Sequence, residues 1–340
     1  MGGAVGARRR PGSNRRPAVA FTTTAVRNGV IRRYTCLVSV SPVTGSHHGR
    51  RPRLLAALAA AAILAVGVTT LACAVAGRGG TQAKAAAPSV EARSGILIDR
   101  QSGKVLWSKS PDMRLAPASC TKIMTALLVL ERYRDLGHYV RVPSAATQHQ
   151  TVAVGLRPGD RITVQQALRA LMVKSANDAA ITLAYAVGRS ESGFVRLMNR
   201  RARALGLTRT HFVNCRGTPE PGHYSSARDL ARLGRYAMRD SRFRAIVSTK
   251  TTMIRWPPSH AVRVTSHNRL LDYPWGDGIK TGATKQSKMV LVGSGKPGLV
   301  PLIVVTMREP SRDQEERDAV ALLKWGSALY EQRLDVAGGQ

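Results

Sequence analysis

Aromatic residues and metal-binding patterns are scarce in this 340-residue chain. Phe, Trp and Tyr make up 5% of the residues, whereas hydrophobic residues as a whole make up 44%. The four cysteines form no Cys-x-x-Cys pair and the eight histidines form no His-Glu-x-x-His motif, which excludes the common zinc-site patterns. The hydrophobic content and the length indicate a globular protein with a sizeable core and exclude a disordered chain.

Acidic residues are few relative to basic ones. The chain holds 52 Lys and Arg against 20 Asp and Glu, a formal net charge of +32. Residues 1–53 contain eleven arginines and no acid, and residues 90–340 still carry a net charge of +19. A domain this basic attracts polyanions, either nucleic acid or the anionic polymers of a cell envelope. Export would separate the domain from DNA and would favour the envelope polymers.

Charged residues are absent from residues 54–76, which directly follow the cluster His48-Gly49-Arg50-Arg51-Pro52-Arg53. A helix of these 23 residues would be about 34 Å long, enough to cross a bilayer core of about 30 Å. The basic flank would stay in the cytoplasm. Ala74-Val75-Ala76 fits a signal-peptide cleavage site. The sequence therefore predicts an extracytoplasmic protein, either secreted or anchored to the membrane by residues 54–76.

The remaining sequence is organised as a single domain with flanking segments. We expect a basic N-terminal segment (1–53) whose residues 1–47 have no evident structure, the apolar segment, a linker (77–93), one domain (94–333) and a tail (334–340). Within the domain, strand patterns cover residues 95–99, 105–107, 289–292 and 302–307, and helical patterns cover residues 119–133, 164–172, 178–187, 194–205 and 322–329. Strands at both ends and helices in the middle predict a mixed α/β fold, with an antiparallel sheet built from the two ends.

The first motif with catalytic potential is Ser119-Cys120-Thr121-Lys122. Positions i and i+3 share one face of a helix, so the Lys122 amine can reach the Ser119 hydroxyl. A serine hydroxyl needs a base to become a strong nucleophile, and lysine is a base only when it is neutral. Burial and a second cation nearby would lower the pKa of Lys122 far enough. The same pattern also begins ordinary helices, so it indicates little by itself.

Two further motifs follow in order. In Ser175-Ala176-Asn177, the hydroxyl can relay a proton and the amide can hold a substrate amide, although both residue types are also favoured helix caps. Ser266-His267-Asn268 matches the same pattern. In Lys280-Thr281-Gly282, the polar side chains can bind a carboxylate and the glycine allows close approach of substrate, although a plain turn is the alternative.

Together, the three motifs and their flanking residues resemble the low-molecular-weight, serine-type D-alanyl-D-alanine carboxypeptidases, which belong to the penicillin-binding proteins. The similarity covers roughly residues 92–333. It is carried by these segments: Ala116-Pro117-Ala118-Ser119-Cys120-Thr121-Lys122-Ile123-Met124-Thr125, Pro158-Gly159-Asp160, Ser175-Ala176-Asn177-Asp178-Ala179-Ala180, Gly222-His223-Tyr224-Ser225-Ser226-Ala227-Arg228-Asp229-Leu230, Asn268-Arg269-Leu270-Leu271 and Gly278-Ile279-Lys280-Thr281-Gly282.

This resemblance implies a fold, a reaction and a set of roles. The sheet would be sandwiched by helices, with a helical subdomain beside it. The enzyme would hydrolyse the terminal D-Ala-D-Ala bond of peptidoglycan stem peptides, be inhibited by β-lactams, and need no metal or organic cofactor. The implied roles are these: nucleophile Ser119, general base Lys122, proton shuttle Ser175, substrate amide binding by Asn177, carboxylate binding by Lys280 and Thr281 with Gly282 admitting substrate, and an oxyanion hole from the backbone N–H groups of Ser119 and Ala283. Ala283 and residues 284–288 depart from the usual family sequence.

Three other functions are weighed against this interpretation. A class A-like β-lactamase would need an added glutamate between the second and third motifs. The comparable stretch, Thr210-His211-Phe212-Val213-Asn214-Cys215-Arg216-Gly217, contains no acid, and neither Glu191 nor Glu220 begins a Glu-x-x-x-Asn run. A catalytically inactive wall-binding relative and a nucleic-acid-binding protein are the other two. The intact motifs argue against the first and the export segment against the second.

The cysteines leave two alternatives open. Cys120 and Cys215 both lie in the exported domain, where thiols tend to oxidise to disulfides. The other alternative is a pair of buried apolar thiols. Spacing alone does not decide between them, because a disulfide depends on geometry.

Overall fold

The computed structural model describes residues 18–27, 30–39, 86–148 and 151–337. The chain divides into two compact units, Met1–Gln82 and Ala83–Gln340. The predicted export segment, residues 54–76, lies outside the described residues. Among the described residues, no helix is both long and apolar enough to cross a membrane.

The first unit contains an antiparallel pair of strands, β1 (Ala18–Arg27) and β2 (Val30–Ser39). The expectation that residues 1–47 have no evident structure was therefore wrong for these strands. Their sequences are rich in valine, isoleucine, threonine and aromatic residues, which favour strands. The two residues between them in the sequence are Asn28-Gly29, the pair most typical of two-residue hairpin turns, so the sequence itself indicates this pairing.

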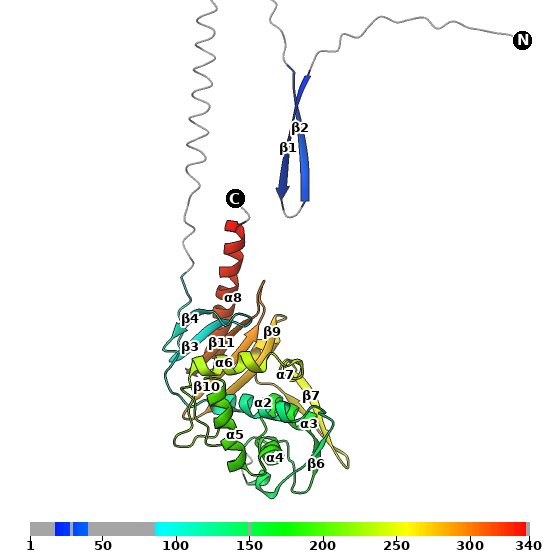
Figure 1. The fold of residues 1–340 in the computed structure, drawn as a ribbon, viewed down its shortest axis with the longest axis vertical. Helices are drawn as coiled ribbons and strands as arrows, with labels where there is room; N and C mark the ends of the chain where they lie inside the picture. Colours follow the sequence, from blue (N-terminus) through cyan, green and yellow to red (C-terminus); the bar gives the residue numbers. More distant parts are fainter. Residues whose placement is uncertain (1–17, 28–29, 40–85, 149–150, 338–340) are drawn as a thin grey trace, which may run out of the picture. The chain divides into compact units, whose positions relative to one another are not determined.

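The second unit is built on a five-stranded antiparallel sheet (Figure 1). Its strand order is β4-β3-β11-β10-β9. The strands are β3 (Ser94–Asp99), β4 (Val105–Lys109), β9 (Gly276–Thr284), β10 (Lys288–Gly295) and β11 (Leu302–Glu309). The sheet is thus made from the two ends of the domain, because β3 pairs directly with β11. This confirms the predicted topology.

Side chains alternate between the two faces of the central strands, and both faces are buried. On β11, Ile303 and Val305 face the core shared with most of the helices, whereas Leu302 and Val304 face a second core. A strand buried on both faces is apolar throughout. Helix α8 (Arg312–Ala337) covers the second face and α6 (Ala227–Ala237) covers the first. The predicted sandwich of helices around an antiparallel sheet is confirmed.

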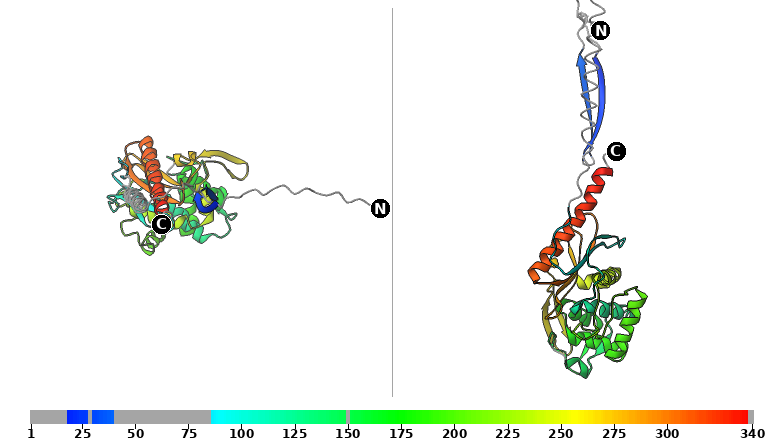
Figure 2. Two further views of the ribbon diagram at one scale, coloured as in Figure 1. Left: turned by 90° about the horizontal axis from the view of Figure 1, so that it is seen from above. Right: turned by 90° about the vertical axis from the view of Figure 1, so that its left-hand side faces the viewer.

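The residues between β4 and β9 contain α6, which covers the sheet, and the helical subdomain with its two small two-stranded sheets, β5-β6 and β7-β8. Figure 2 shows its green helices gathered together, apart from the red α8. Its remaining elements are η1 (Ala118–Thr121), α2 (Lys122–Arg132), β5 (Tyr139–Arg141), η2 (Ser144–Thr147), β6 (Arg161–Thr163), α3 (Val164–Arg169), η3 (Ala170–Lys174), α4 (Asn177–Gly188), α5 (Glu191–Ala204), α7 (Ser241–Val247), β7 (Thr251–Trp256), β8 (His260–Thr265) and η4 (Arg269–Asp272).

The segment just before β3 is packed against the domain. Val90 and Ala92 are buried in the second core. The backbone N–H of Glu91 donates to Asp318 on α8 at 2.6 Å, and Lys109 Nζ donates to the Val90 carbonyl at 2.7 Å. The end of the expected linker over 77–93 therefore belongs to the folded unit.

Candidate active site

The predicted nucleophile lies on a tight turn that leads into α2. Ser119 is part of the 3₁₀ turn η1, and Lys122 is the first residue of α2. A 3₁₀ turn has three residues per turn, so positions i and i+3 lie directly above one another. Lys122 Nζ donates to Ser119 Oγ at 3.2 Å. The predicted pair is thus brought together, although by a 3₁₀ turn where the sequence pattern had indicated α-helix from Ser119 onward.

Lys122 is almost completely buried, with 1% of its surface exposed. Its ammonium also donates to Asn177 Oδ1 at 2.9 Å and to the Arg216 carbonyl at 2.6 Å. Burial, and to a smaller extent the positive charge of Lys280, lower the pKa of Lys122 to about 7. Both causes were predicted from the sequence, and the direction of the shift is confirmed.

The second motif follows an irregular helical segment. The expected helix over 164–172 is α-helical only to Arg169 and then widens into the π-helical turn η3, a feature often found at functional sites. Ser175 ends it in the left-handed conformation, with φ 70°. The Ser175 hydroxyl is buried and has no hydrogen-bond partner among the described residues. Such a hydroxyl is available to a ligand, because an unpaired buried polar group is otherwise costly.

The two Ser-x-Asn motifs have different roles in the structure. Asn177 begins α4 and joins the site, since its Oδ1 accepts from Lys122 and its Nδ2 donates to Thr151 at 3.2 Å. Asn268, in the other match, instead caps the turn η4 by accepting from the backbone of Leu270 at 3.1 Å. The sequence pattern alone treated these two matches as equal.

The third motif lies on the edge strand β9, beside the nucleophile turn. Lys280 and Thr281 are buried, and burial lowers the pKa of Lys280 to about 8. A Cβ atom at Gly282 would lie 2.9 Å from the Ser119 nitrogen, so no side chain fits there without displacing the turn. Ala283, next along the strand, is exposed. The backbone of β9 at Gly282 therefore lies directly against the backbone of Ser119.

Several residues that support the site were not predicted. Arg216 presents its carbonyl to Lys122, and its buried guanidinium lies 3.3 Å from Glu191. The backbone N–H groups of Arg216 and Gly217 both donate to Asn214 Oδ1. Gly217 packs directly against the nucleophile turn, because a Cβ there would lie 1.8 Å from the Ala118 carbonyl oxygen. Residues 212–217 (Phe-Val-Asn-Cys-Arg-Gly) resemble the family's Phe-x-Asn-Pro-x-Gly segment, with Cys215 in place of proline, and this resemblance is the sequence signal for the loop.

His223 holds the start of α2 from the other side. Its Nδ1 accepts from the backbone N–H of Val213 at 3.0 Å, so the proton lies on Nε2, which donates to Thr121 Oγ1 at 2.9 Å. Burial lowers the pKa of His223 to about 4, which keeps the ring neutral. A neutral ring adds no charge to the two lysines of the site.

Cys120 and Cys215 do not pair with one another. Cys120 and Cys215 are both free and buried. The Cys120 thiol donates to the Lys280 carbonyl at 3.5 Å, whereas the Cys215 thiol lies 3.2 Å from Glu191 Oε1. Of the two alternatives, the disulfide is wrong and the pair of buried thiols is confirmed.

We accordingly expect both thiols to react with iodoacetamide once the purified chain is unfolded without reductant. Peptide mapping by mass spectrometry should find the label on Cys120 and on Cys215. In the folded chain both should react slowly, because burial raises the pKa of Cys120 to about 12 and raises that of Cys215 as well. A Cys120–Cys215 cross-linked peptide would contradict the structure.

Within the residues that the structure describes, no group of three His, Cys, Asp or Glu side chains is placed to hold a metal ion. The site consists of a serine, two buried lysines, a free serine hydroxyl and an asparagine around a strand edge. These residue types, in this order along the chain, are those shared by penicillin-binding proteins and class A β-lactamases.

Comparison with known proteins identifies the family to which the chain belongs. Residues 81–311 match the family of D-alanyl-D-alanine carboxypeptidases, and we conclude that the chain belongs to this family. It is 35% identical over 247 residues to D-alanyl-D-alanine carboxypeptidase DacF of Bacillus subtilis (strain 168), which covers 71% of the chain and 63% of that protein. It is likewise 35% identical over 260 residues to DacC of Escherichia coli (strain K12), covering 72% of the chain and 63% of that relative.

Solved structures agree with this assignment. The Streptomyces K15 DD-transpeptidase superimposes with a TM-score of 0.68 at 30% identity, covering 72% of this chain and 99% of that one. A D-alanyl-D-alanine carboxypeptidase from Mycobacterium tuberculosis H37Rv gives a TM-score of 0.68 at 31% identity, covering 73% of this chain and 95% of that one.

Proposed function

We propose that the protein is a serine D-alanyl-D-alanine carboxypeptidase, which hydrolyses the terminal D-Ala-D-Ala bond of peptidoglycan stem peptides. The observation that carries the proposal is the buried Lys122 amine, bonded to Ser119 Oγ and held at a pKa of about 7. A lysine in this state can accept a proton from serine at neutral pH. Family membership supports the substrate class.

In the proposed mechanism, Lys122 takes the Ser119 proton as Oγ attacks the carbonyl carbon of the penultimate D-alanine. The backbone N–H groups of Ser119 and Ala283 stabilise the oxyanion, and Gly282 leaves the approach to them free. Lys280 and Thr281 bind the terminal carboxylate. Ser175 passes a proton to the leaving D-alanine amine, and Asn177 binds a substrate amide. Water then attacks the acyl-serine ester and releases the shortened peptide.

Contacts around Glu191 and Glu220 favour this function over a β-lactamase. Glu191 accepts from the Cys215 backbone and lies beside Arg216, while Glu220 accepts from Asn214 Nδ2 at 2.9 Å. Both carboxylates are thus bound to the loop under Lys122 and are occupied by its donors. A class A β-lactamase needs a glutamate free to activate water for deacylation.

The test combines a peptide with a penicillin. The full chain should release one D-alanine from a pentapeptide ending in D-Ala-D-Ala, detected by mass spectrometry. Benzylpenicillin should leave a penicilloyl mass on the protein that persists for many minutes. Rapid turnover of penicillin without a lasting adduct would instead show a β-lactamase. Failure to form an adduct or to release D-alanine would show an inactive relative.

We further propose that the enzyme acts outside the cytoplasm. Its substrate lies in the cell wall, and residues 54–76 provide the export signal, as a cleaved signal or as a membrane anchor. The positive charge of the domain would favour anionic polymers of the envelope over nucleic acid, which an exported protein does not meet. Protease protection of the chain in intact cells, compared with spheroplasts, tests this location.

A further inference from the structure

A small cavity beyond the end of β9 is not used by the mechanism above. Its volume is about 210 Å³, and it is lined by Arg114, Leu115, Ala116, Gln286, Ser287 and Arg308. Leu115 and Ala116 lead into the nucleophile turn, whereas Gln286 and Ser287 belong to the turn between β9 and β10. Pockets for whole small molecules begin at about 300 Å³, so this cavity suits a single side chain.

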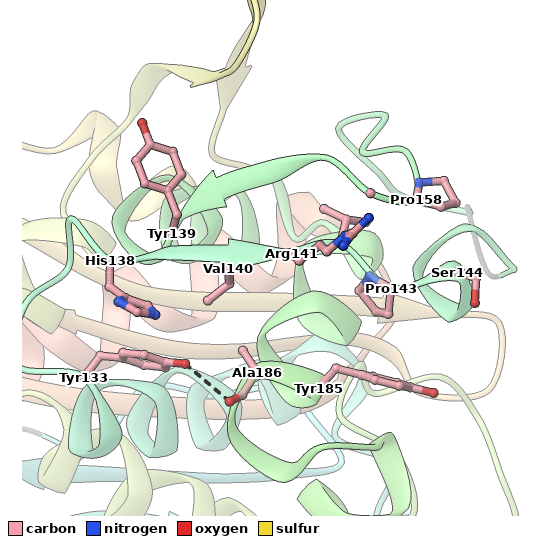
Figure 3. A pocket seen from close by; sticks show the side chains of 12 residues that line it. Tyr133, His138, Tyr139, Val140, Arg141, Pro143, Ser144, Pro158, Tyr185 and Ala186 are labelled. Atoms are coloured by element: carbon pink, nitrogen blue, oxygen red, sulfur yellow. Dashed lines mark hydrogen bonds between the residues drawn. The ribbon is translucent and has the colours of Figure 1, made fainter.

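A larger hollow, of about 600 Å³, lies beside β5 in the helical subdomain (Figure 3). Its lining residues come from 133–144, 158–159 and 185–186, and none of them belongs to β9 or to the nucleophile turn. The smaller cavity, in contrast, lies where a ligand bound along β9 can reach it.

The proposed binding mode directs the substrate peptide toward the small cavity. β9 is an edge strand, so a peptide can add to its free side as a further strand. With its terminal carboxylate at Lys280 and its reacting carbonyl at the Ala283 N–H, the peptide runs antiparallel to β9, and its earlier residues pass toward Gln286. Ala283 and Gln286 are exposed, so this path follows the surface, and at about 3.3 Å per residue it is at most about 10 Å long.

Hydrogen bonds hold the turn between β9 and β10 in shape. The backbone N–H of Thr284 donates to Ser287 Oγ at 3.0 Å, and the backbone N–H of Ser287 donates to Thr284 Oγ1 at 2.9 Å. Lys285 and Lys288, which flank the two lining residues of the turn, are both exposed. This wall of the cavity is therefore preformed and positively charged.

Arg308 occupies a backbone position that glycine would fit better. The pairing of β10 with β11 shifts register between Met289 and Val290, which leaves Arg308 as the extra residue of a β-bulge. Its φ is 62°, the left-handed conformation in which one common class of bulge carries glycine. Bulges re-aim side chains beside active sites, and a non-glycine residue kept in this conformation indicates a functional constraint.

The two arginines of the cavity are not neutralised by ion pairs. The Arg114 guanidinium lies over the Tyr224 ring, 4.8 Å from its centroid. Neither Arg114 nor Arg308 has an ion pair or a side-chain hydrogen bond among the described residues. Both are exposed, so their donors are open to a ligand.

The acids nearest to these arginines in the sequence do not compete for them. Asp112 accepts two hydrogen bonds from Arg228, at 2.8 and 3.0 Å. Glu309 is completely buried, and the cavity lining itself contains no acid. Guanidinium groups bind carboxylates through paired, charge-assisted hydrogen bonds. The cavity is therefore suited to a carboxylate that the ligand supplies.

We propose that Arg114 and Arg308 bind a side-chain carboxylate on the residue that precedes D-Ala-D-Ala in the substrate. The inference rests on the proposed function, and it makes the enzyme selective for acidic stem peptides. That residue lies one step beyond the reacting D-alanine, about 3.3 Å further along β9. An extended acidic side chain spans the remaining distance to the arginines.

The experiment compares two peptides on the full chain, acetyl-L-Glu-D-Ala-D-Ala and acetyl-L-Gln-D-Ala-D-Ala, which differ only in the side-chain carboxylate. We expect kcat/KM for release of D-alanine to be about tenfold higher for the acidic peptide. Arg114→Gln and Arg308→Gly should each remove most of this preference and leave kcat/KM for the amide peptide unchanged. Glycine relieves the backbone at position 308, so the fold should persist.

Arg189→Gly is the matched control, because Arg189 is an exposed arginine with φ 63° at the end of α4, outside the cavity. It should keep the full preference. Labelling by penicillin shows that the active site of each variant is intact, and Arg308→Asn, which also tolerates this conformation, replaces a glycine variant that does not label.

Equal kcat/KM values for the two peptides in the parent chain would overturn the proposal, as would a variant at position 114 or 308 that keeps the parent's preference. Release of D-alanine from both peptides without a preference refutes the carboxylate site alone. If neither peptide releases D-alanine, the proposed function fails and the carboxylate site fails with it.

Discussion

Replacing Ser119 with alanine is expected to abolish covalent labelling by penicillin and to lower kcat for D-alanine release by about 10⁴- to 10⁶-fold. The hydroxyl oxygen is the atom that would form the ester, and no other side chain accepts a hydrogen bond from Lys122 except Asn177 among the described residues. Labelling with a fluorescent penicillin, followed by intact mass, measures the first effect. A coupled assay for D-alanine measures the second.

Folding should be nearly unaffected in the Ser119→Ala chain. The residue is partly exposed, and its hydroxyl makes a single hydrogen bond, worth about 1 kcal/mol. Ser108→Ala, on the exposed surface of β4, is the matched control and should label like the parent. Undiminished labelling of Ser119→Ala at an unchanged melting temperature would remove Ser119 from the nucleophile role.

Replacing Lys122 with arginine is expected to slow acylation by about 10²- to 10⁴-fold, the usual contribution of a general base. Arginine keeps its proton at every pH at which the protein is folded, so it cannot accept one from Ser119. Stopped-flow acylation by a chromogenic β-lactam measures the rate. Lys104→Arg, an exposed lysine, should acylate at the parent rate. Retained acylation in Lys122→Arg would contradict the base role.

In the unmutated chain, the titration of Lys122 should appear in the pH dependence of catalysis. Lys122 is a base only when deprotonated, and its pKa lies near 7, so kcat/KM should rise with pH through an inflection near 7. The unfolded chain holds this proton up to a pKa of about 10.5. Between pH 7 and 10.5 the unfolded state therefore binds more protons, and the free energy of unfolding contributed by Lys122 rises with pH. Below pH 7 both states hold the proton, so the dependence on pH ends there and the buried ammonium opposes folding to its full extent.

The sheet and most helices were predictable because the apolar residues of each element follow one periodicity, that of a buried strand or that of a helix. The apolar runs of β10 and β11 and the helical spacing of α4 appear in the structure close to their expected bounds. The π-helical turn after Arg169 was not predictable, because its apolar spacing continues that of the α-helix before it. The three-residue strands β5 and β6 are too short for any periodic signal.

The sequence predicted those residues of the candidate site that act through their side chains, but not those that act through backbone groups. Ser119, Lys122 and Asn177 were found because their residue types and spacing carry chemistry. Arg216 acts through its carbonyl, which every residue possesses, so no residue type marks it.

The pairing of β3 with β11 places a constraint on the order of events during synthesis. A chain emerging from the ribosome presents β3 and then α2 more than 150 residues before Leu302 appears. Until then β3 lacks its neighbour in the sheet. The turn η1, which carries Ser119, likewise lacks its neighbour β9 until residues 276–284 have been synthesised. The proposed active site is therefore incomplete in every shorter nascent chain.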